Sequence, residues 1–220
     1  MTYNNPNING STWSKLNILE TLRKRNPLVI CITNDVVRTF TANGLLAIGA
    51  SPVMSECSED LEDLIVHASA LLINIGTVTP DKVTYYKEAI TLAKAHEVPI
   101  VLDPVGCHAG AYRLSVVLDL IKTDAISLLR GNQSEIKAIY DALNTNHKVN
   151  NSLSGKGVDG EQVEDSAIIT YRLARQISCP VVATGEEDYV SDGTRVFAVP
   201  HGHPIMTAVT GTGCLLGAVL

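Results

Sequence analysis

The chain has 220 residues, of which 45% are hydrophobic and 18% are charged, and its formal net charge is -6 at pH 7. This length suits one α/β domain. The acidic balance argues against a nucleic-acid partner, which would need a basic face. No apolar run approaches the ~18 residues that span a membrane, so we also expect no membrane partner.

The five cysteines are widely spaced and form no CxxC pair. This usage argues against a disulfide framework and against a structural zinc site. The N-terminal sequence MTYNNPNING is polar and lacks the apolar segment of a signal peptide. Together these features predict a protein of the reducing cytoplasm.

Short β-branched runs alternate with longer segments of helical periodicity along the chain. We predict buried strands at residues 27–33, 51–55, 70–76, 99–106, 124–132 and 179–185. Between them we predict helices at residues 35–49, 58–70, 79–98, 133–143 and about 163–177, with another helical stretch after Arg113. Ser58 and Thr79 are the expected N-caps of two of these helices, and Pro80 suits a first helical position.

Two segments differ from this alternation. Residues 188–200 alternate around Asp192-Gly193, which predicts a β-hairpin. Residues 146–162 are rich in Gly, Ser and Asn and predict a flexible surface excursion from a single domain. Repeated strand–helix units with continuously apolar strands predict an α/β fold of three layers, in which a mainly parallel central sheet is flanked by helices.

Polar residues stand at the ends of the predicted strands, where open α/β sheets bind their ligands. They include Asn34, Asn74, Asp103, Arg130 and Thr184. Residue type alone leaves other readings open. Asp103 also suits a helix N-cap or an ion-pair partner, Arg130 a surface position, and Thr184 a turn in which its hydroxyl bonds to the backbone.

A glycine-rich loop at residues 210–214 joins these strand ends. We expect it to follow a short β-like run and to precede a helix that begins at Cys214. Its glycines allow a tight turn with exposed N–H groups, and the helix N-terminus adds positive potential, so the loop suits a phosphate. The alternative is a purely structural turn that leads into the helix and binds no ligand. The spacing of this loop does not match GxGxxG, because Leu216 occupies the last position, and GxxxxGK[ST] appears nowhere in the chain, so a dinucleotide fold or a P-loop has no support.

Six stretches of the sequence resemble the hydroxyethylthiazole kinase family, whose fold is ribokinase-like. They are CITNDVVRTFTANGLLAIGASPVM, LLINIGT, PIVLDPVG, LLRGNQSEI, VVATGEEDYVSDG and GHPIMTAVTGTGC, and they keep the family's order from residue 27 onward. The cysteine of GTGC separates this family from most of its relatives, which carry aspartate at that place.

This resemblance implies an activity: transfer of the ATP γ-phosphate to the primary alcohol of 4-methyl-5-(2-hydroxyethyl)thiazole, with Mg²⁺, in thiamine salvage or biosynthesis. It also implies a homotrimer with active sites at the subunit interfaces. Members of the family continue for several helices beyond the start of the last predicted helix. We therefore expect residues 1–220 to be a single kinase domain that lacks its C-terminal helices.

The resemblance also implies roles for individual residues. The residues implied to line or bind the thiazole are Asn34, Val36, Met54 and Gly211. Those implied to contact ATP or the transferring phosphate are Arg130, Thr184, Thr210, Thr212 and Gly213. The physical chemistry of these residues agrees, because a neutral thiazole needs an adaptable apolar wall and an arginine pairs with phosphate oxygens through a fixed fork of donors.

Two carboxylates and one thiol complete the implied site. Asp103 and Glu135 would organise Mg²⁺, directly or through water, since this ion prefers oxygen ligands. Cys214 would occupy the place of the catalytic base. We interpret this thiol as a weak or dispensable base, because phosphoryl transfer passes through a loose transition state that needs little early deprotonation.

The alternative functions fall into two classes, other enzymes of the same fold and a protein that binds nucleotide without catalysis. The same fold could carry a pyrimidine-alcohol kinase or an ATP-dependent dehydratase of hydrated nicotinamide nucleotides, but Cys214 and the string TNDVVRTFTANG argue against both. A nucleotide-binding pseudoenzyme is the other alternative. It is favoured by His108, a bulky residue in a stretch where the family carries small residues, and by the short C-terminus.

Overall fold

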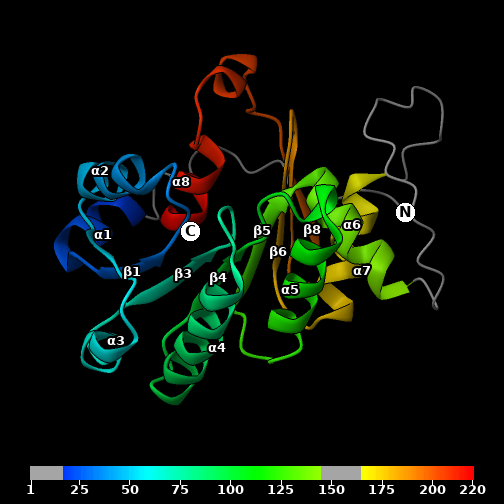
Figure 1. Ribbon diagram of the computed structural model, residues 1–220. Coiled ribbons are helices and arrows are strands. Elements are labelled where there is room, and N and C mark those ends of the chain that lie inside the picture. The colour runs from blue at the N-terminus through cyan, green and yellow to red at the C-terminus, as the bar shows by residue number, and fades with distance from the viewer. Residues whose placement is uncertain (1–16, 145–164) are drawn as a thin grey trace.

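The computed structural model describes residues 17–144 and 165–220, so the excursion predicted at residues 146–162 lies outside the described residues. An 8-stranded sheet in the order β2-β1-β3-β4-β5-β6-β7-β8 forms the centre (Figure 1). Its strands are β1 (Leu28–Ile32), β2 (Ser51–Met54), β3 (Ala70–Asn74), β4 (Ile100–Asp103), β5 (Leu128–Asn132), β6 (Val181–Thr184), β7 (Asp188–Ser191) and β8 (Val196–Val199).

Strands β1 to β6 run parallel, and β7 and β8 add an antiparallel hairpin at one edge. The helices are α1 (Ile18–Arg25), α2 (Arg38–Ile48), α3 (Ser58–Ile65), α4 (Pro80–Ala95), α5 (Ala111–Ile121), α6 (Gln133–Asn144), α7 (Ser166–Gln176) and α8 (Thr212–Val219). Helices α3 to α7 pack on one face of the sheet, and α1, α2 and α8 pack on the other. The predicted three-layer α/β fold with a mainly parallel sheet is therefore confirmed.

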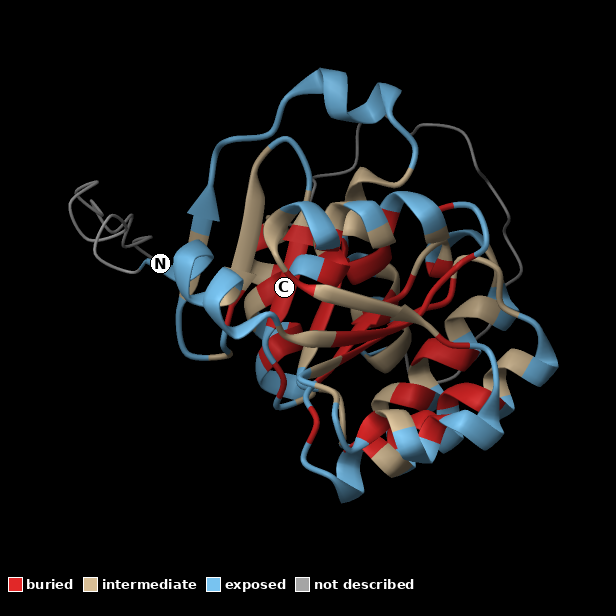
Figure 2. Cartoon of the chain, turned by 90° about the vertical axis from the view of Figure 1, so that its left-hand side faces the viewer, coloured by how far each residue is buried: buried red, intermediate tan, exposed pale blue. Residues whose placement is uncertain are grey.

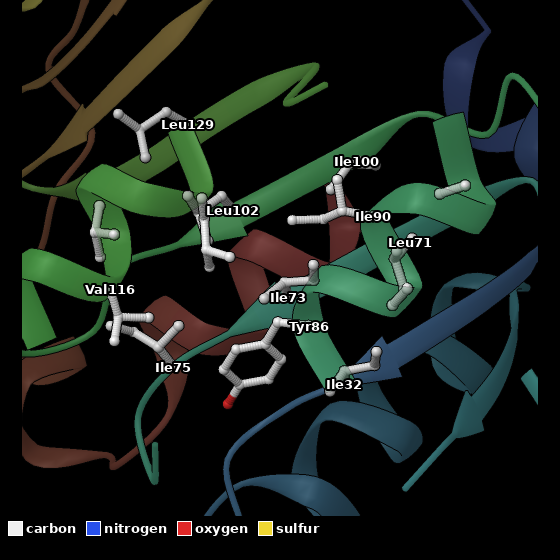
Figure 3. Close-up of a cluster of buried hydrophobic side chains, with 14 of the residues drawn as sticks. Ile32, Leu71, Ile73, Ile75, Tyr86, Ile90, Ile100, Leu102, Val116 and Leu129 are labelled. Atoms are coloured by element: carbon white, nitrogen blue, oxygen red, sulfur yellow. The ribbon is translucent and has the colours of Figure 1, made fainter. Parts of the chain in front are cut away.

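The larger core lies between the sheet and helices α3 to α7. It is built from aliphatic side chains with Tyr86 of α4 lying across the strands (Figure 3). Leu71, Ile73, Ile100 and Leu102 in the central strands are all fully buried. Each buried side chain of this size contributes about 1.5–3 kcal/mol, so this face provides the larger share of the apolar burial. Figure 2 shows the buried strands at the centre of the molecule.

The opposite face has a smaller core. Leu45 of α2 and Ala218 of α8 meet Val29, Leu72 and Val101 of the strands there. Because neighbouring residues of a strand point to opposite faces, Leu72 faces α8 while Leu71 and Ile73 face the larger core. The same alternation decides where the strand-end polar side chains point.

Several local expectations need correction. The chain forms α1, which its short and exposed sequence did not predict. Ser58 is the first residue of α3 rather than its N-cap, and its hydroxyl donates to Glu88. Helix α8 begins at Thr212, two residues before the expected start at Cys214. A 3-10 helix, Pro204–Ala208, stands where we expected a β-like run.

Other local expectations are confirmed. The Thr79 hydroxyl accepts a hydrogen bond from the Lys82 N–H at 3.2 Å, and Pro80 is the first residue of α4. The hairpin turns at Asp192-Gly193, where the glycine has a φ of +81°. Within the described parts of the chain, no helix combines the length and the apolar character that crossing a membrane requires.

Candidate active site

Four strand-end side chains point toward the face of the sheet that α8 covers. They are Asn74 at the end of β3, Asp103 at the end of β4, Arg130 in β5 and Thr184 at the end of β6. Asn74 and Asp103 are register partners, and each follows a residue that faces the larger core. The alternation of strand side chains therefore gathers these groups beneath the start of α8.

Asp103 is the carboxylate of this group and is fully buried, with 0% exposure. Its Oδ2 accepts a hydrogen bond from Asn74 Nδ2 at 2.9 Å and lies 3.5 Å from Arg130 Nη1. Its Oδ1 has no hydrogen-bond partner among the described residues. Burial raises the pKa of Asp103 to about 7, although Arg130 and Asn74 act in the opposite direction. The carboxyl thus presents one uncommitted acceptor.

Arg130 lies directly under the glycine turn of α8. Its Nη2 donates to Thr184 Oγ1 at 2.6 Å, and only 6% of the residue is exposed. A Cβ atom on Gly213 would stand 2.9 Å from Nη2, so the guanidinium and the helix backbone approach this closely because residue 213 is glycine. Arg130 is therefore held between the strand ends and the first turn of the helix.

The first turn of α8 supplies backbone donors. Gly211 is the N-cap residue with a φ of +90°, and a Cβ there would stand 2.6 Å from Val37 Cγ1. In any α-helix the first N–H groups have no acceptor within the helix, so the amides of residues 212–214 are available to an anion. Thr212 turns its hydroxyl back to the Met206 carbonyl at 3.2 Å, and Thr210 is exposed.

Glu135 lies at the start of α6 and is 5% exposed. Its Oε1 accepts the Gly106 N–H at 2.8 Å, and its Oε2 accepts the Asn132 N–H at 2.8 Å. Asn132 Oδ1 in turn accepts the Glu135 N–H, which completes a capping box. Glu135 thus ties the loop after β4 to the start of α6, and each of its oxygens already accepts one amide.

Asn34 and Cys214 form the opposite end of the site. Asn34 Nδ2 donates to Asn74 Oδ1 at 2.9 Å and lies 3.5 Å from Cys214 Sγ. Burial raises the pKa of the Cys214 thiol, and the Asp103 carboxylate raises it further, while hydrogen bonds from the asparagines and the charge of Arg130 act to lower it. The thiol is therefore protonated near neutral pH.

The other residues implied to bind the thiazole lie at the same edge. The Val36 N–H donates to Asn34 Oδ1 at 3.2 Å, and the Val36 side chain is 70% exposed. Met54 ends β2 and is the register partner of Cys31 in β1. His108 is exposed in a 3-10 helix, Cys107–Ala109, so its bulk points to solvent and does not crowd the loop.

Sequence reasoning assigned no role to two residues that the structure places here. Asn74 stood among the polar strand ends, and the alternation of β3 could have shown that it faces Asp103. Arg113 of α5 donates to the carbonyls of Ile75, Val105 and Gly76 at 2.9, 3.1 and 2.9 Å. No sequence signal indicates this, because the contact joins loops that only the fold brings together.

The model of the hydroxyethylthiazole kinase family matches residues 19–220. The chain belongs to this family. A hydroxyethylthiazole kinase of Streptococcus agalactiae serotype III (strain NEM316) is 53% identical over 202 residues, which are 92% of this chain and 75% of that protein. A hydroxyethylthiazole kinase of Streptococcus suis (strain 05ZYH33) is 50% identical and covers 92% of this chain and 74% of its own.

Solved structures agree with this assignment. The hydroxyethylthiazole kinase protein of Pyrococcus horikoshii OT3 superposes with a TM-score of 0.81 at 39% identity, covering 92% of this kinase chain and 73% of that one. A ribokinase-like superfamily protein of Enterococcus faecalis V583 superposes with a TM-score of 0.58 at 12% identity, covering 87% of this chain and 68% of its own, which shows the shared fold. This hydroxyethylthiazole kinase family member thus has a ribokinase-like architecture.

Proposed function

We propose that this chain transfers the γ-phosphoryl group of ATP to the primary alcohol of 4-methyl-5-(2-hydroxyethyl)thiazole. The observation that carries the proposal is the placement of Arg130, which lies between Asp103 and Thr184 and against Gly213 at the first turn of α8. A guanidinium and a helix N-terminus that face one point form a site for a phosphoryl group. The family and the names of its relatives supply the acceptor alcohol.

Positioning and charge stabilisation would account for most of the rate. Phosphoryl transfer spreads negative charge over the equatorial oxygens in its transition state, so fixed donors at this point lower the barrier. The amides of residues 212–214 and Arg130 are such donors, and Thr184 holds the guanidinium in place. We assign Thr210, Thr212 and Gly213 to this phosphate loop through their backbone.

The thiazole would bind beside this loop. Asn34, Val36 and Met54 follow β1 and β2, and Gly211 is the N-cap that brings α8 against Val37. The Asn34 amide faces Cys214, so the hydroxyl of a thiazole bound here would lie near the first turn of α8. The acceptor oxygen would then lie close to the phosphoryl site, as an in-line transfer requires.

The residues present fit a magnesium ion. Magnesium is commonly held by one or two carboxylates together with substrate phosphates and water, and it would neutralise charge on the phosphates when bound. Asp103 offers its partnerless Oδ1 to such an ion. Both oxygens of Glu135 already accept backbone amides, so we assign Glu135 an indirect role through water. No cluster of three or more His, Cys, Asp or Glu occurs in the described ranges 17–144 and 165–220.

Cys214 is a weak base in this proposal. Its raised pKa leaves little thiolate near neutral pH, because burial disfavours the charged form. The Asn34 amide donates toward the sulfur, so the S–H hydrogen is free to point at the bound alcohol. Cys214 would then hold the alcohol by a weak hydrogen bond rather than remove its proton early.

We further propose that the kinase acts in thiamine salvage, resides in the cytoplasm and forms a homotrimer with its sites at subunit interfaces. All five cysteines are free thiols, which supports a reducing compartment.

Exposed apolar side chains near the site support the proposed trimer, because a subunit interface would cover them. Val36 is 70% exposed, and Ile205 and Met206 are 66% and 50% exposed on a segment that projects beyond the sheet (Figure 1). Light scattering of the purified protein tests the trimer.

One assay tests the proposed function. The purified protein is incubated with ATP, Mg²⁺ and the thiazole alcohol, and mass spectrometry is used to detect the phosphate ester. We expect the ester, and we expect much slower turnover of a pyrimidine alcohol and of a hydrated nicotinamide nucleotide. Binding of ATP without any ester would instead support the pseudoenzyme alternative, and preferred turnover of either rival substrate would contradict the thiazole assignment.

A further inference from the structure

Asn74 is a fully buried amide that lies between the two halves of the site. It is 0% exposed and ends β3, between Asn34 on the thiazole side and Asp103 on the phosphoryl side. Its Oδ1 accepts from Asn34 Nδ2 at 2.9 Å and from the Gly76 N–H at 3.0 Å. Its Nδ2 donates to Asp103 Oδ2 at 2.9 Å. All of these hydrogen-bond partners of Asn74 thus belong to the site or to the loop that follows β3.

The direction of these hydrogen bonds is fixed by chemistry. A backbone N–H can only donate, so the Gly76 amide requires the oxygen of Asn74 at that position. The nitrogen of Asn74 must then face Asp103. The Val36 N–H fixes Asn34 in the same way and leaves Asn34 Nδ2 for Asn74 and Cys214. Each of the two side-chain amides therefore has one possible orientation. Together they form a continuous chain of hydrogen bonds from the Cys214 thiol to the Asp103 carboxylate.

Close packing keeps this arrangement in place. A Cβ atom on Gly76 would stand 2.8 Å from the Cβ and Nδ2 atoms of Asn34, so the loop after β3 presses on Asn34 without a side chain of its own. Arg113 holds the same loop from the other side through the carbonyls of Ile75 and Gly76. Packing and hydrogen bonds thus hold the loop, Asn74 and Asn34 together.

We propose that Asn74 is a positioning residue that orients Asn34 for the thiazole and Asp103 for the phosphoryl group. This inference rests on the proposed function, since it concerns the same two half-sites. Asn74 touches neither substrate in the proposal and acts through the side chains of Asn34, Asp103 and Cys214. Loss of its oxygen would release Asn34, and loss of its nitrogen would remove the shortest donor to Asp103.

Two substitutions separate these effects. Asn74→Ala removes both groups, so we expect the KM for the thiazole alcohol to rise about tenfold and kcat to fall about tenfold. Asn74→Asp is isosteric and keeps an oxygen for Asn34 and Gly76, but it replaces the amide donor to Asp103 with a second carboxyl, which repels the Asp103 carboxylate or shares a proton with it. We expect Asn74→Asp to lower kcat and to leave the KM for the thiazole alcohol within about twofold of the unchanged protein.

Two further measurements distinguish positioning from a purely structural role. Thr170→Ala is the matched control, because Thr170 is 0% exposed and hydrogen-bonded within α7, away from the site. It should lower the melting temperature without changing KM or kcat. Combining Asn74→Ala with Asn34→Ala should raise KM no further than Asn34→Ala alone, since residues that act through one contact are not additive.

Binding of the thiazole alcohol to the full chain without ATP, measured by calorimetry, gives a readout apart from turnover. We expect Asn74→Ala to weaken this binding about tenfold and Asn74→Asp to preserve it. Asn74 is not a positioning residue if Asn74→Ala folds with unchanged KM, kcat and binding, or if Asn74→Asp weakens binding as much as Asn74→Ala. Thiazole binding without any ester from the unchanged protein would overturn the proposed function and leave the binding comparison intact as the test of Asn74.

Discussion

The two faces of the sheet use the same strands for different purposes. In β3 and β4, Ile73 and Leu102 lie fully buried against helices α3 to α7, whereas Asn74 and Asp103, one residue later in each strand, face α8. The first face gains stability from continuous apolar burial. The second carries buried polar groups that are costly unless each finds a partner. Strand alternation alone therefore separates the stabilising face from the proposed chemical face, which is the face that α8 covers.

Of the substitutions proposed, Arg130→Met should cause the largest loss of activity on the face that α8 covers. The change removes the guanidinium under α8 and leaves Asp103 without its cationic partner, so we expect kcat/KM to fall about 10³-fold. Arg195→Met is the matched control, because Arg195 pairs with Asp192 on the exposed hairpin. Steady-state kinetics of both variants measure the difference. Equal activities of the two variants would remove Arg130 from the mechanism.

Gly213→Ala tests the close approach of helix and guanidinium. The new Cβ would stand 2.9 and 3.0 Å from the Arg130 nitrogens, so we expect kcat/KM to fall roughly 10²-fold through displacement of Arg130. Alanine favours a helix by about 1 kcal/mol, which offsets part of the cost of moving the buried Arg130 away from Asp103, so thermal stability should fall only slightly. Gly193→Ala gives the reverse pattern, because a φ of +81° strains any side chain in the hairpin turn. An active Gly213→Ala variant would contradict the packing we describe.

Arg113→Ala tests how the stabilising face supports the site. Arg113 reaches from α5, on the larger-core face, to three carbonyls of the loops after β3 and β4. Its removal should lower the free energy of unfolding by about 1–3 kcal/mol, because partly buried carbonyls lose their donor. Chemical denaturation measures this loss. Arg113→Lys should recover only part of it, and an unchanged unfolding midpoint for Arg113→Ala would show that the clamp contributes nothing.

Cys214→Ala should have the smallest effect on turnover. A protonated thiol contributes little as a base, so we expect kcat to fall about tenfold or less. A loss that approaches about 10⁴-fold, the upper range for a general base, would refute this interpretation of Cys214.

The pH dependence of stability offers a second test of the thiol. Burial raises the pKa of Cys214 above 9.0, so in alkaline solution the unfolded chain loses this proton before the folded chain does. The contribution of Cys214 to stability is therefore fully present below pH 9.0 and is lost as pH rises through the raised pKa. The difference in unfolding free energy between the unchanged protein and Cys214→Ala should stay constant below pH 9.0 and change only in this alkaline range. A difference that changes with pH near neutrality would indicate a lowered pKa instead.

The sequence predicted the parts of this molecule that depend on local patterns. Apolar runs located the strands, and the Thr79 cap and the Asp192-Gly193 turn have strong local signatures. Helix α1 was missed because it is short and none of its residues is buried. The start of α8 was placed too late because the left-handed backbone of Gly211, rather than the first apolar residue, begins the helix.

The candidate site was only partly predictable for a physical reason. Strand ends identified Asp103 and Arg130, but their ion pair depends on the register of β4 and β5, which sequence does not encode locally. The commitment of both Glu135 oxygens to backbone amides likewise depends on where the loop after β4 lies. Asn74 could have been found by counting alternation from the apolar residues of β3.

A crystal structure of the full chain with a non-hydrolysable ATP analogue and the thiazole alcohol tests the central claim most directly. We predict that the γ-phosphate lies between the amides of residues 212–214 and Arg130, on the side of the sheet where Asp103 ends β4, with the alcohol beside Asn34. A γ-phosphate bound away from the first turn of α8, or out of reach of Arg130, would contradict the account.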